Sequence, residues 1–155
     1  MPEYHLAQLN VGVLTGPLDS PGLADFAAML IRVNALADAA PGFVWRLRAD
    51  DDGAVIQAGH GNEPGLLVNL SVWQDLESLR AFTYRDGSHL DMLRRRREFF
   101  RKMDQPHLAL WWIPAGHIPT EDEAFARLGR LRNEGPGPDA FTFRQPYPAP
   151  APSMA

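Results

Sequence analysis

The sequence predicts one α+β domain, a ferredoxin-like antiparallel sheet with helices on one face. Short apolar segments without helical periodicity alternate with segments that have it, and clusters of Gly, Pro and Asp separate them. Their order is strand, helix, two strands, two helices and a strand, followed by an extra helix. The 155 residues are the length of one domain. We expect it to span residues 1–145, with a disordered Pro- and Ala-rich tail at 146–155.

Four segments have the composition and length of strands. Each is apolar, lacks the period of a helix and ends at a turn. They cover residues 4–14, 43–48, 66–73 and 108–113. Val55 and Ile56 can extend the second strand into a hairpin, and a strand-like patch follows at 141–143.

The first helix is predicted to begin at Ser20 and Pro21. A serine hydroxyl can accept a hydrogen bond from the free amides of a first turn, and proline suits the first helical position. An apolar stripe continues to Ala37, before the Pro-Gly pair at 41–42 ends the helix. Asn34 interrupts this stripe, so its amide needs a partner inside the protein, either a neighbouring loop or a ligand.

The region after the third strand is also predicted to be helical. Asp75 can cap its first turn, and the turn at 86–88 divides it into two parts. The second part begins near His89, and its apolar stripe reaches Met103.

A last helix follows the fourth strand. Thr120 and Glu123 have the spacing of a capping box, in which each side chain binds a free amide of the other residue. We expect this helix to run to Asn133.

The composition and motifs exclude several classes of function. The chain contains no cysteine, which excludes disulfides and thiolate chemistry, and its net charge of −4 argues against nucleic acid as a partner. No apolar run approaches the roughly 18 residues of a membrane span and no secretory leader is recognisable, so we expect a cytoplasmic protein without membrane contact. The histidines lack metal-binding spacing, so no metal site is expected, and phosphate-loop, dinucleotide and nucleophile-elbow motifs do not occur.

The strand at residues 66–73 carries polar groups on one face. Successive side chains of a strand point to opposite faces, so Asn69, Ser71 and Trp73 share one side. Polar groups on a face that helices cover indicate a pocket for a small molecule.

The other face of this strand carries Val68, Leu70 and Val72. If the helices cover only one side of the sheet, these side chains form an apolar patch in water, which is unfavourable. We therefore expect a homodimer that forms through this face.

Arg96 lies in the middle of the apolar stripe that begins near His89, so it should face inward. Burying a guanidinium costs several kcal/mol unless it is paired, and its candidate partners are a carboxylate of the protein, a set of backbone carbonyls and an anionic ligand. His89 can act as a general base because its intrinsic pKa is about 6.5, or it can simply belong to the start of a helix.

Three aromatic residues complete the candidate site. Tyr84 can orient an oxygenated substrate, although a buried ring with an exposed hydroxyl fits its place near a helix end equally well. Trp45 and Trp73 offer flat walls for an aromatic ligand, although the tryptophans of a small domain are more often part of its core.

Four segments of the chain resemble domain-of-unknown-function family 3291. They are HLAQLN at 5–10, GFVWRL at 42–47, NLSVW at 69–73 and LWWIPAGH at 110–117, and the resemblance continues through 140–143. That family resembles the dimeric α+β barrel superfamily. The resemblance implies two ferredoxin-like protomers with paired sheets, and a pocket between each sheet and its helices.

The superfamily includes several chemistries. Its antibiotic-biosynthesis monooxygenases use neither metal nor flavin and place an Asn and a Trp four residues apart on a strand, as Asn69 and Trp73 are here. Haem-degrading relatives combine an Asn on the first strand with a Trp and a helical His, to which Asn10, Trp73 and His89 would correspond here. The spacing from Trp73 to His89 is longer than that pattern. Cyclases, isomerases and dechlorinating lyases also occur, so the resemblance leaves the chemistry open.

We therefore expect a cofactor-independent enzyme of small-molecule, secondary metabolism, a monooxygenase, cyclase or isomerase. It would act on an aromatic or polycyclic substrate by proton transfer, followed by oxidation, cyclisation or rearrangement. The alternative is a non-catalytic protein that binds a hydrophobic ligand or haem. The expected catalytic residues are His89, Arg96, Asn69 and Tyr84, and the expected substrate-binding residues are Trp73, Trp45, Asn34 and Ser71.

Overall fold

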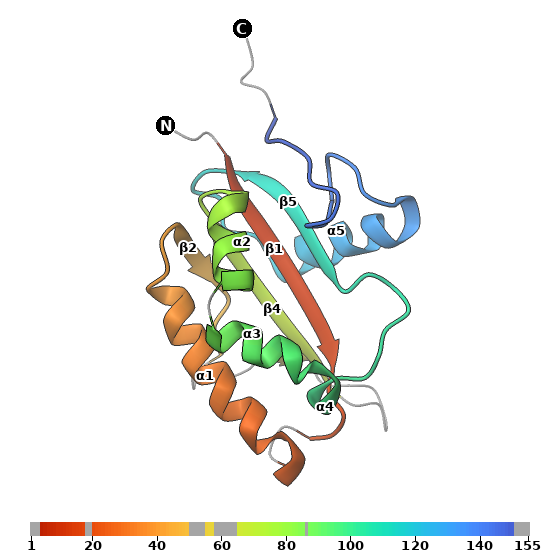
Figure 1. Ribbon diagram of the computed structural model, residues 1–155. Coiled ribbons are helices and arrows are strands. Elements are labelled where there is room, and N and C mark those ends of the chain that lie inside the picture. The colour runs from red at the N-terminus through yellow and green to blue at the C-terminus, as the bar shows by residue number, and fades with distance from the viewer. Residues whose placement is uncertain (1–3, 18–19, 50–54, 58–64, 86, 151–155) are drawn as a thin grey trace, which may run out of the picture.

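The computed structural model describes residues 4–17, 20–49, 55–57, 65–85 and 87–150. The strands form an antiparallel sheet in the order β2-β4-β1-β5, with β3 also paired to β4 (Figure 1). Their bounds are β1 (Tyr4–Val13), β2 (Phe43–Arg46), β3 (Val55–Gln57), β4 (Leu66–Trp73) and β5 (Leu108–Pro114). The predicted α+β fold with an antiparallel sheet is confirmed.

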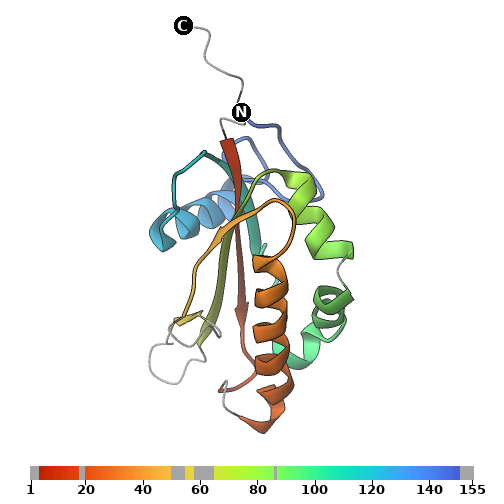
Figure 2. The same ribbon diagram turned by 90° about the vertical axis from the view of Figure 1, so that its left-hand side faces the viewer.

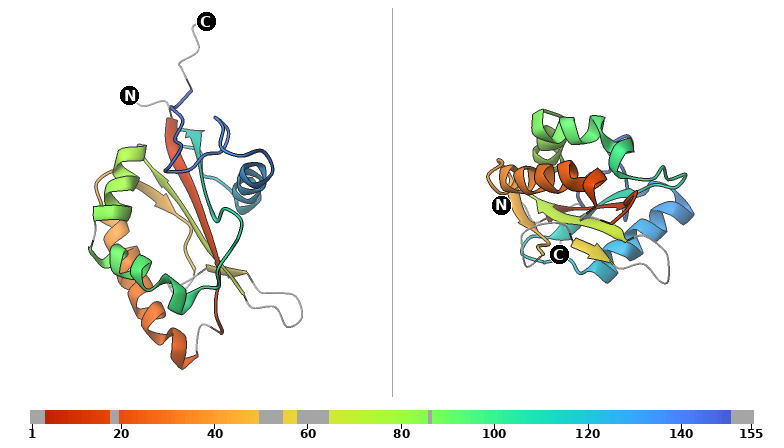
Figure 3. Two further views of the ribbon diagram at one scale, coloured as in Figure 1. Left: turned by 45° about the vertical axis from the view of Figure 1, so that its right-hand side comes forward. Right: turned by 90° about the horizontal axis from the view of Figure 1, so that it is seen from below.

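Helices lie on both faces of this sheet. A 3-10 turn at Pro21–Leu23 precedes the first of the α-helices in the described residues, which are α1 (Ala24–Asp38), α2 (Leu76–Arg85), α3 (Gly87–Arg94), α4 (Arg96–Phe99) and α5 (Glu121–Glu134). Figures 1 and 2 show α1 to α4 over one face of β1 and β4. The view from below in Figure 3 shows α5 beyond the opposite face. The extra helix therefore closes the side that the other four leave open.

The face that carries Val68, Leu70 and Val72 is covered within the single chain. These side chains pack in one cluster with Leu9 of β1 and Leu128 of α5, and all of them are buried. The expectation that this face stays in water until a second copy covers it is wrong, because α5 provides the cover. A homodimer stays a prediction, but this face is not its cause.

The start of α5 is fixed to the sheet by side chains. Thr120 Oγ1 accepts a hydrogen bond of 3.1 Å from the Glu123 amide, as the capping pattern predicts. The Glu123 carboxylate instead binds His117 Nε2 at 2.7 Å and accepts from Trp111 Nε1 at 3.1 Å. Since Trp111 lies on β5, this second bond holds the helix against the strand.

The chain after α5 returns to the free edge of β5. Leu110 and Phe141 exchange two backbone hydrogen bonds of 2.8 Å, which form the predicted strand-like patch. The Tyr147 carbonyl accepts a hydrogen bond of 2.9 Å from Trp112 Nε1. The chain is thus held beyond the expected domain end at 145, and residues 151–155 of the expected tail lie outside the described residues.

The helix predicted to reach Met103 ends earlier, at Phe99. Phe100 has an extended backbone and forms a β-bridge with Leu14. Its ring packs directly on Gly12, where a Cβ atom would collide with it. Contact with the end of β1 therefore replaces the last turn of the predicted helix.

Leu70→Ala is expected to lower the free energy of unfolding by about 2–5 kcal/mol, because it leaves a cavity between the sheet and α5. Leu70 is 2% exposed, and Ile118, which is 57% exposed, provides the control. Ile118→Ala should change stability by less than about 0.5 kcal/mol. Urea denaturation followed by circular dichroism measures both. An unchanged urea midpoint for Leu70→Ala would contradict the burial of this sheet face beneath α5.

Candidate functional site

A cavity of about 270 Å³ lies between the sheet and the helices α1 to α4. Its floor is the face of β1 and β4 that points away from α5. Its walls come from α1, α2, the α3–α4 region, the residues just before β5 and the chain that follows α5. In Figure 2 the helical walls stand over the two central strands.

The pairing of β1 with β4 gathers polar residues on the floor. Gln8 stands opposite Ser71, and Asn10 stands opposite Asn69. Gln8 Nε2 donates to Ser71 Oγ at 2.9 Å and also to Asn69 Oδ1. Trp73 Nε1 donates to the same serine oxygen at 3.0 Å. The four side chains therefore hold one another in a fixed arrangement.

These bonds leave two hydrogen-bond donors for a ligand. Ser71 Oγ accepts from both Gln8 and Trp73, so both of its lone pairs are used and its hydrogen must point elsewhere. Asn69 Oδ1 accepts from Gln8, which leaves the Nδ2 hydrogens of that amide. Among the described residues neither group has an acceptor. The floor thus offers an O–H and an NH₂ group to the cavity.

Asn34 on α1 faces the same cavity. Its side chain is 8% exposed, and within the described ranges its amide makes no hydrogen bond. The predicted alternative, a bond to a neighbouring loop, is not formed by those residues. Because the amide faces the cavity, water or a polar group of a bound molecule can provide its partner.

Arg46 is a buried cation that the protein neutralises. Its Nε and Nη2 donate to the two carboxylate oxygens of Asp38 at 2.8 and 3.2 Å, and Arg48 adds a contact of 3.1 Å. The hydrogen bond from Arg46 holds the pKa of Asp38 below its ordinary value. A register shift between Phe43 and Trp45 turns Arg46 toward the cavity and Trp45 to the other face.

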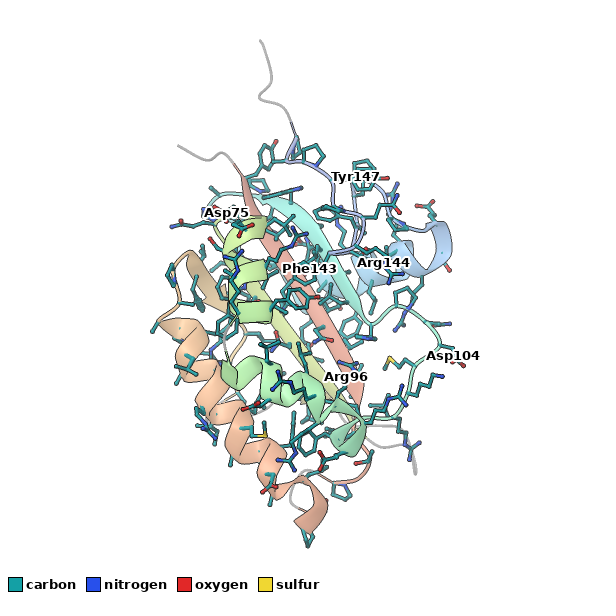
Figure 4. All side chains as sticks on the ribbon, viewed as in Figure 1. Asp75, Arg96, Asp104, Phe143, Arg144 and Tyr147 are labelled. Carbon is teal, nitrogen blue, oxygen red and sulfur yellow. The ribbon has the colours of Figure 1, made fainter. Side chains whose placement is uncertain are left out.

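Arg96 on α4 is half-buried and has no carboxylate partner among the described residues. Its guanidinium carbon lies 5.4 Å from the centre of the Phe100 ring, and no Asp or Glu of the described chain lies within 4 Å. Burial lowers the pKa of Arg96. Figure 4 shows Arg96 at the α3–α4 end of the cavity. The described residues place no carboxylate against this guanidinium, so the predicted ion pair inside the protein is not formed by them, and binding of an anionic ligand stays a prediction.

His107 lines the cavity just before β5 and lies within reach of the Arg96 charge. Its Nδ1 is 3.3 Å from Asn10 Oδ1. Because an amide oxygen only accepts, Nδ1 carries the hydrogen and Nε2 the lone pair. Burial and then the charges of Arg96 and Arg132 lower the pKa of His107.

Aromatic rings line the end of the cavity where β4 finishes. The Trp73 ring stacks on Phe82 with centroids 5.4 Å apart and meets the edge of Phe43 at 5.5 Å. Tyr84 is half-exposed and packs edge-on against Phe143 at 5.4 Å. The cavity therefore has an aromatic end and a charged end.

The structure brings most of the predicted site residues together. Those that line the cavity are Asn34, Asn69, Ser71, Trp73, Tyr84 and Arg96. The prediction for Trp45 is wrong, because the register shift in β2 places it with the core cluster beneath α5. His89 belongs to α3, but its side chain lies outside the described residues, so its catalytic role stays a prediction.

Three further lining residues, Gln8, Arg46 and His107, are absent from the predicted site. Gln8 had a usable signal, because it interrupts an apolar strand two residues before Asn10. The position of Arg46 in the cavity depends on a register shift in β2, and that of His107 on a contact with a residue far away in the chain. The described residues contain no group of three or more His, Asp or Glu that could hold a metal. They also contain no helix of the length and apolar character that a membrane span requires.

Arg96→Leu is expected to leave the free energy of unfolding within about 1 kcal/mol of wild type. Leucine keeps the packing of the stem, and the lost contact with Phe100 is offset by removal of a half-buried charge. Arg46→Leu is the control and should cost about 1.5–3 kcal/mol, because it removes both hydrogen bonds from Arg46 to Asp38, which then keeps the contact with Arg48. Urea and thermal denaturation measure the stability of both variants. Equal losses would mean that Arg96 has an internal partner.

The lowered pKa of His107 predicts a loss of stability on acidification. Below about pH 6.5 the unfolded chain takes up a proton at this residue while the folded protein resists it. The contribution of His107 to the free energy of unfolding is therefore fully present above about pH 6.5. It is lost as the pH falls toward the lower pKa of this residue in the folded protein. Urea midpoints across this window should fall less in His107→Gln than in wild type. An equal fall of the urea midpoint in both proteins would argue against a lowered pKa of His107.

Comparison with known proteins identifies the family. No curated protein matches the sequence. SnoaB from Streptomyces nogalater, described as a cofactor-independent oxygenase, is 17% identical over 76% of this chain and 98% of its own, with a TM-score of 0.46. A protein of unknown function from Nitrosomonas europaea is 15% identical over 77% of this chain and 99% of its own, with a TM-score of 0.47. The model of the domain-of-unknown-function family DUF3291 matches residues 5–155, so the chain belongs to that family, as predicted.

Proposed function

We propose that this protein is a cofactor-independent enzyme of small-molecule metabolism that acts on an aromatic or polycyclic substrate. The observation that carries the proposal is Arg96, a half-buried cation in the cavity that no described carboxylate neutralises. A cation that faces a cavity and that no described carboxylate pairs is a candidate binding group, because it is free to meet a negative charge there. Its natural partner is a negative charge on a ligand.

The shape and lining of the cavity support a flat, mostly apolar ligand. Trp73, Phe82 and Phe43 give an aromatic wall at one end. Asn34 and Asn69 supply a few polar groups that would fix the orientation of the ligand. The volume of about 270 Å³ lies just below the range for small-molecule sites, which begins at about 300 Å³.

The proposed reaction begins with the loss of a substrate proton. Negative charge then develops on an oxygen atom that Arg96 and Asn69 stabilise. Fixed donors in a site that excludes water stabilise such a charge more strongly than water does. The electron-rich enolate or phenolate can then react with dioxygen, close a ring or rearrange. Tyr84 would orient the substrate, and His89 stays a candidate for moving the proton.

A turnover screen tests this proposal. Protein dialysed against a chelator is incubated with fused aromatic phenols and ketones, and products and dioxygen uptake are followed by mass spectrometry and an oxygen electrode. We expect turnover to persist after chelation. Asn69→Ala and Arg96→Leu should each lower kcat by about 10²- to 10³-fold, because each removes a donor to the developing charge.

Two tryptophans provide a matched control for this screen. Trp73→Phe should raise KM because it changes the cavity wall, whereas Trp45→Phe lies on the other face and should leave kcat and KM unchanged. Saturable binding of the compounds without turnover would contradict the enzyme and favour a ligand carrier. A Soret band on titration with haemin would then identify haem as the class of ligand.

A further inference from the structure

His107 is held in place by β1. Its backbone carbonyl accepts a hydrogen bond of 2.9 Å from the Val11 amide, and its ring Nδ1 lies 3.3 Å from Asn10 Oδ1. Both its main chain and its ring are therefore fixed by neighbouring residues of one strand. Asn10 also selects the tautomer, because its oxygen requires a hydrogen on Nδ1. The lone pair is left on Nε2, to which no described residue donates.

The charged groups around His107 are cations. Arg96 comes from α4, and Arg132 comes from α5, where its Nε donates to the Pro106 carbonyl at 2.8 Å. Within the described ranges no carboxylate is bonded to the imidazole. Burial and these two charges lower the pKa of His107. The ring is therefore neutral near pH 7 and able to accept a proton.

We infer that His107 is the base of the proposed enzyme, and that the substrate is a fused aromatic molecule with an acidic hydroxyl group held beside Arg96. The inference rests on the proposed function and adds the base and the class of substrate. In this step the substrate O–H bond breaks and a new N–H bond forms at His107 Nε2. The electron pair stays on the substrate oxygen, which becomes a phenolate or enolate. No oxidant or reductant takes part.

The same surroundings restrict the substrate. Proton transfer is efficient when the acid and the base have similar pKa values, and neighbouring cations make His107 a weak base. Aliphatic alcohols are too weakly acidic to match it. A phenol conjugated with a carbonyl or nitro group on a fused ring is a better match, and a cation within about 4–6 Å lowers the pKa of such a group by roughly 1–3 units. After transfer, Arg96 and the imidazolium flank one oxyanion.

A coloured phenol tests the assignment without knowledge of the natural substrate. The probe is 4-nitro-1-naphthol, whose anion absorbs visible light, and its methyl ether is the control that cannot ionise. Binding is measured at a pH at which the free naphthol is protonated and His107 is neutral. We expect the bound naphthol to show the anion band, with its pKa lowered by roughly 1–3 units. The ¹⁵N signals of the His107 side chain should change from neutral imidazole to imidazolium, and the ether should bind without either change.

Proton release separates the role of His107 from that of Arg96. In wild type the naphthol proton stays on His107, so calorimetry in two buffers of different ionisation enthalpy should detect almost no release. In His107→Gln, which can still donate to Asn10, about one proton per bound ligand should pass to the buffer. Arg96→Leu should lose the anion band. His117→Gln, which changes an exposed histidine paired with Glu123, should behave as wild type.

The outcomes distinguish the two proposals. Saturable binding of naphthol with a neutral His107 in wild type would overturn the assignment of the base and leave the ligand cavity standing. That measurement uses only the wild-type protein, so it decides even if His107→Gln fails to fold. If neither the naphthol nor its ether binds saturably, the proposed function is contradicted and the inference falls with it.

Discussion

The pairing of β1 with β4 is the constraint on which the rest of the structure depends. One register places Leu9 opposite Leu70 on the face toward α5, and Gln8 opposite Ser71 on the face toward the cavity. Because side chains alternate along a strand, a slip of one residue would exchange the two faces. Leucines would then line the cavity and amides would meet α5. Burial of the apolar face therefore also fixes the geometry of the polar one.

Two arginines in the cavity wall differ in whether the protein supplies a carboxylate partner for them. Both line the cavity, but Arg46 is bound through two nitrogen atoms to Asp38 of α1, while Arg96 meets only an aromatic ring within the described chain. The first has its electrostatic partner built into the protein and serves to join β2 to α1. The second has no carboxylate partner among the described residues, which is why the proposed function assigns it an anionic ligand. The difference lies in the partner and not in the residue type.

The sequence predicted features that depend on neighbouring residues. Thr120 caps α5, and alternation along β4 placed Asn69 and Trp73 on the cavity face. Features that depend on contacts between residues far apart in the chain could not be predicted from the sequence. A helical stripe does not reveal which face of a sheet it will cover, so the position of α5 was missed. The bond between His107 and Asn10 joins residues 97 positions apart, and no local pattern announces it.

The chain after α5 gives the cavity a wall of a different kind. Phe143 lines the cavity, its carbonyl accepts a hydrogen bond of 3.2 Å from Arg80, and the neighbouring Phe141 is bonded to the outer edge of β5. A segment attached at a sheet edge can change in length or composition without disturbing the pairing of the central strands. Within this architecture, the wall that this segment adds to the cavity can therefore differ in size between related chains while the polar side chains of β1 and β4 stay in place.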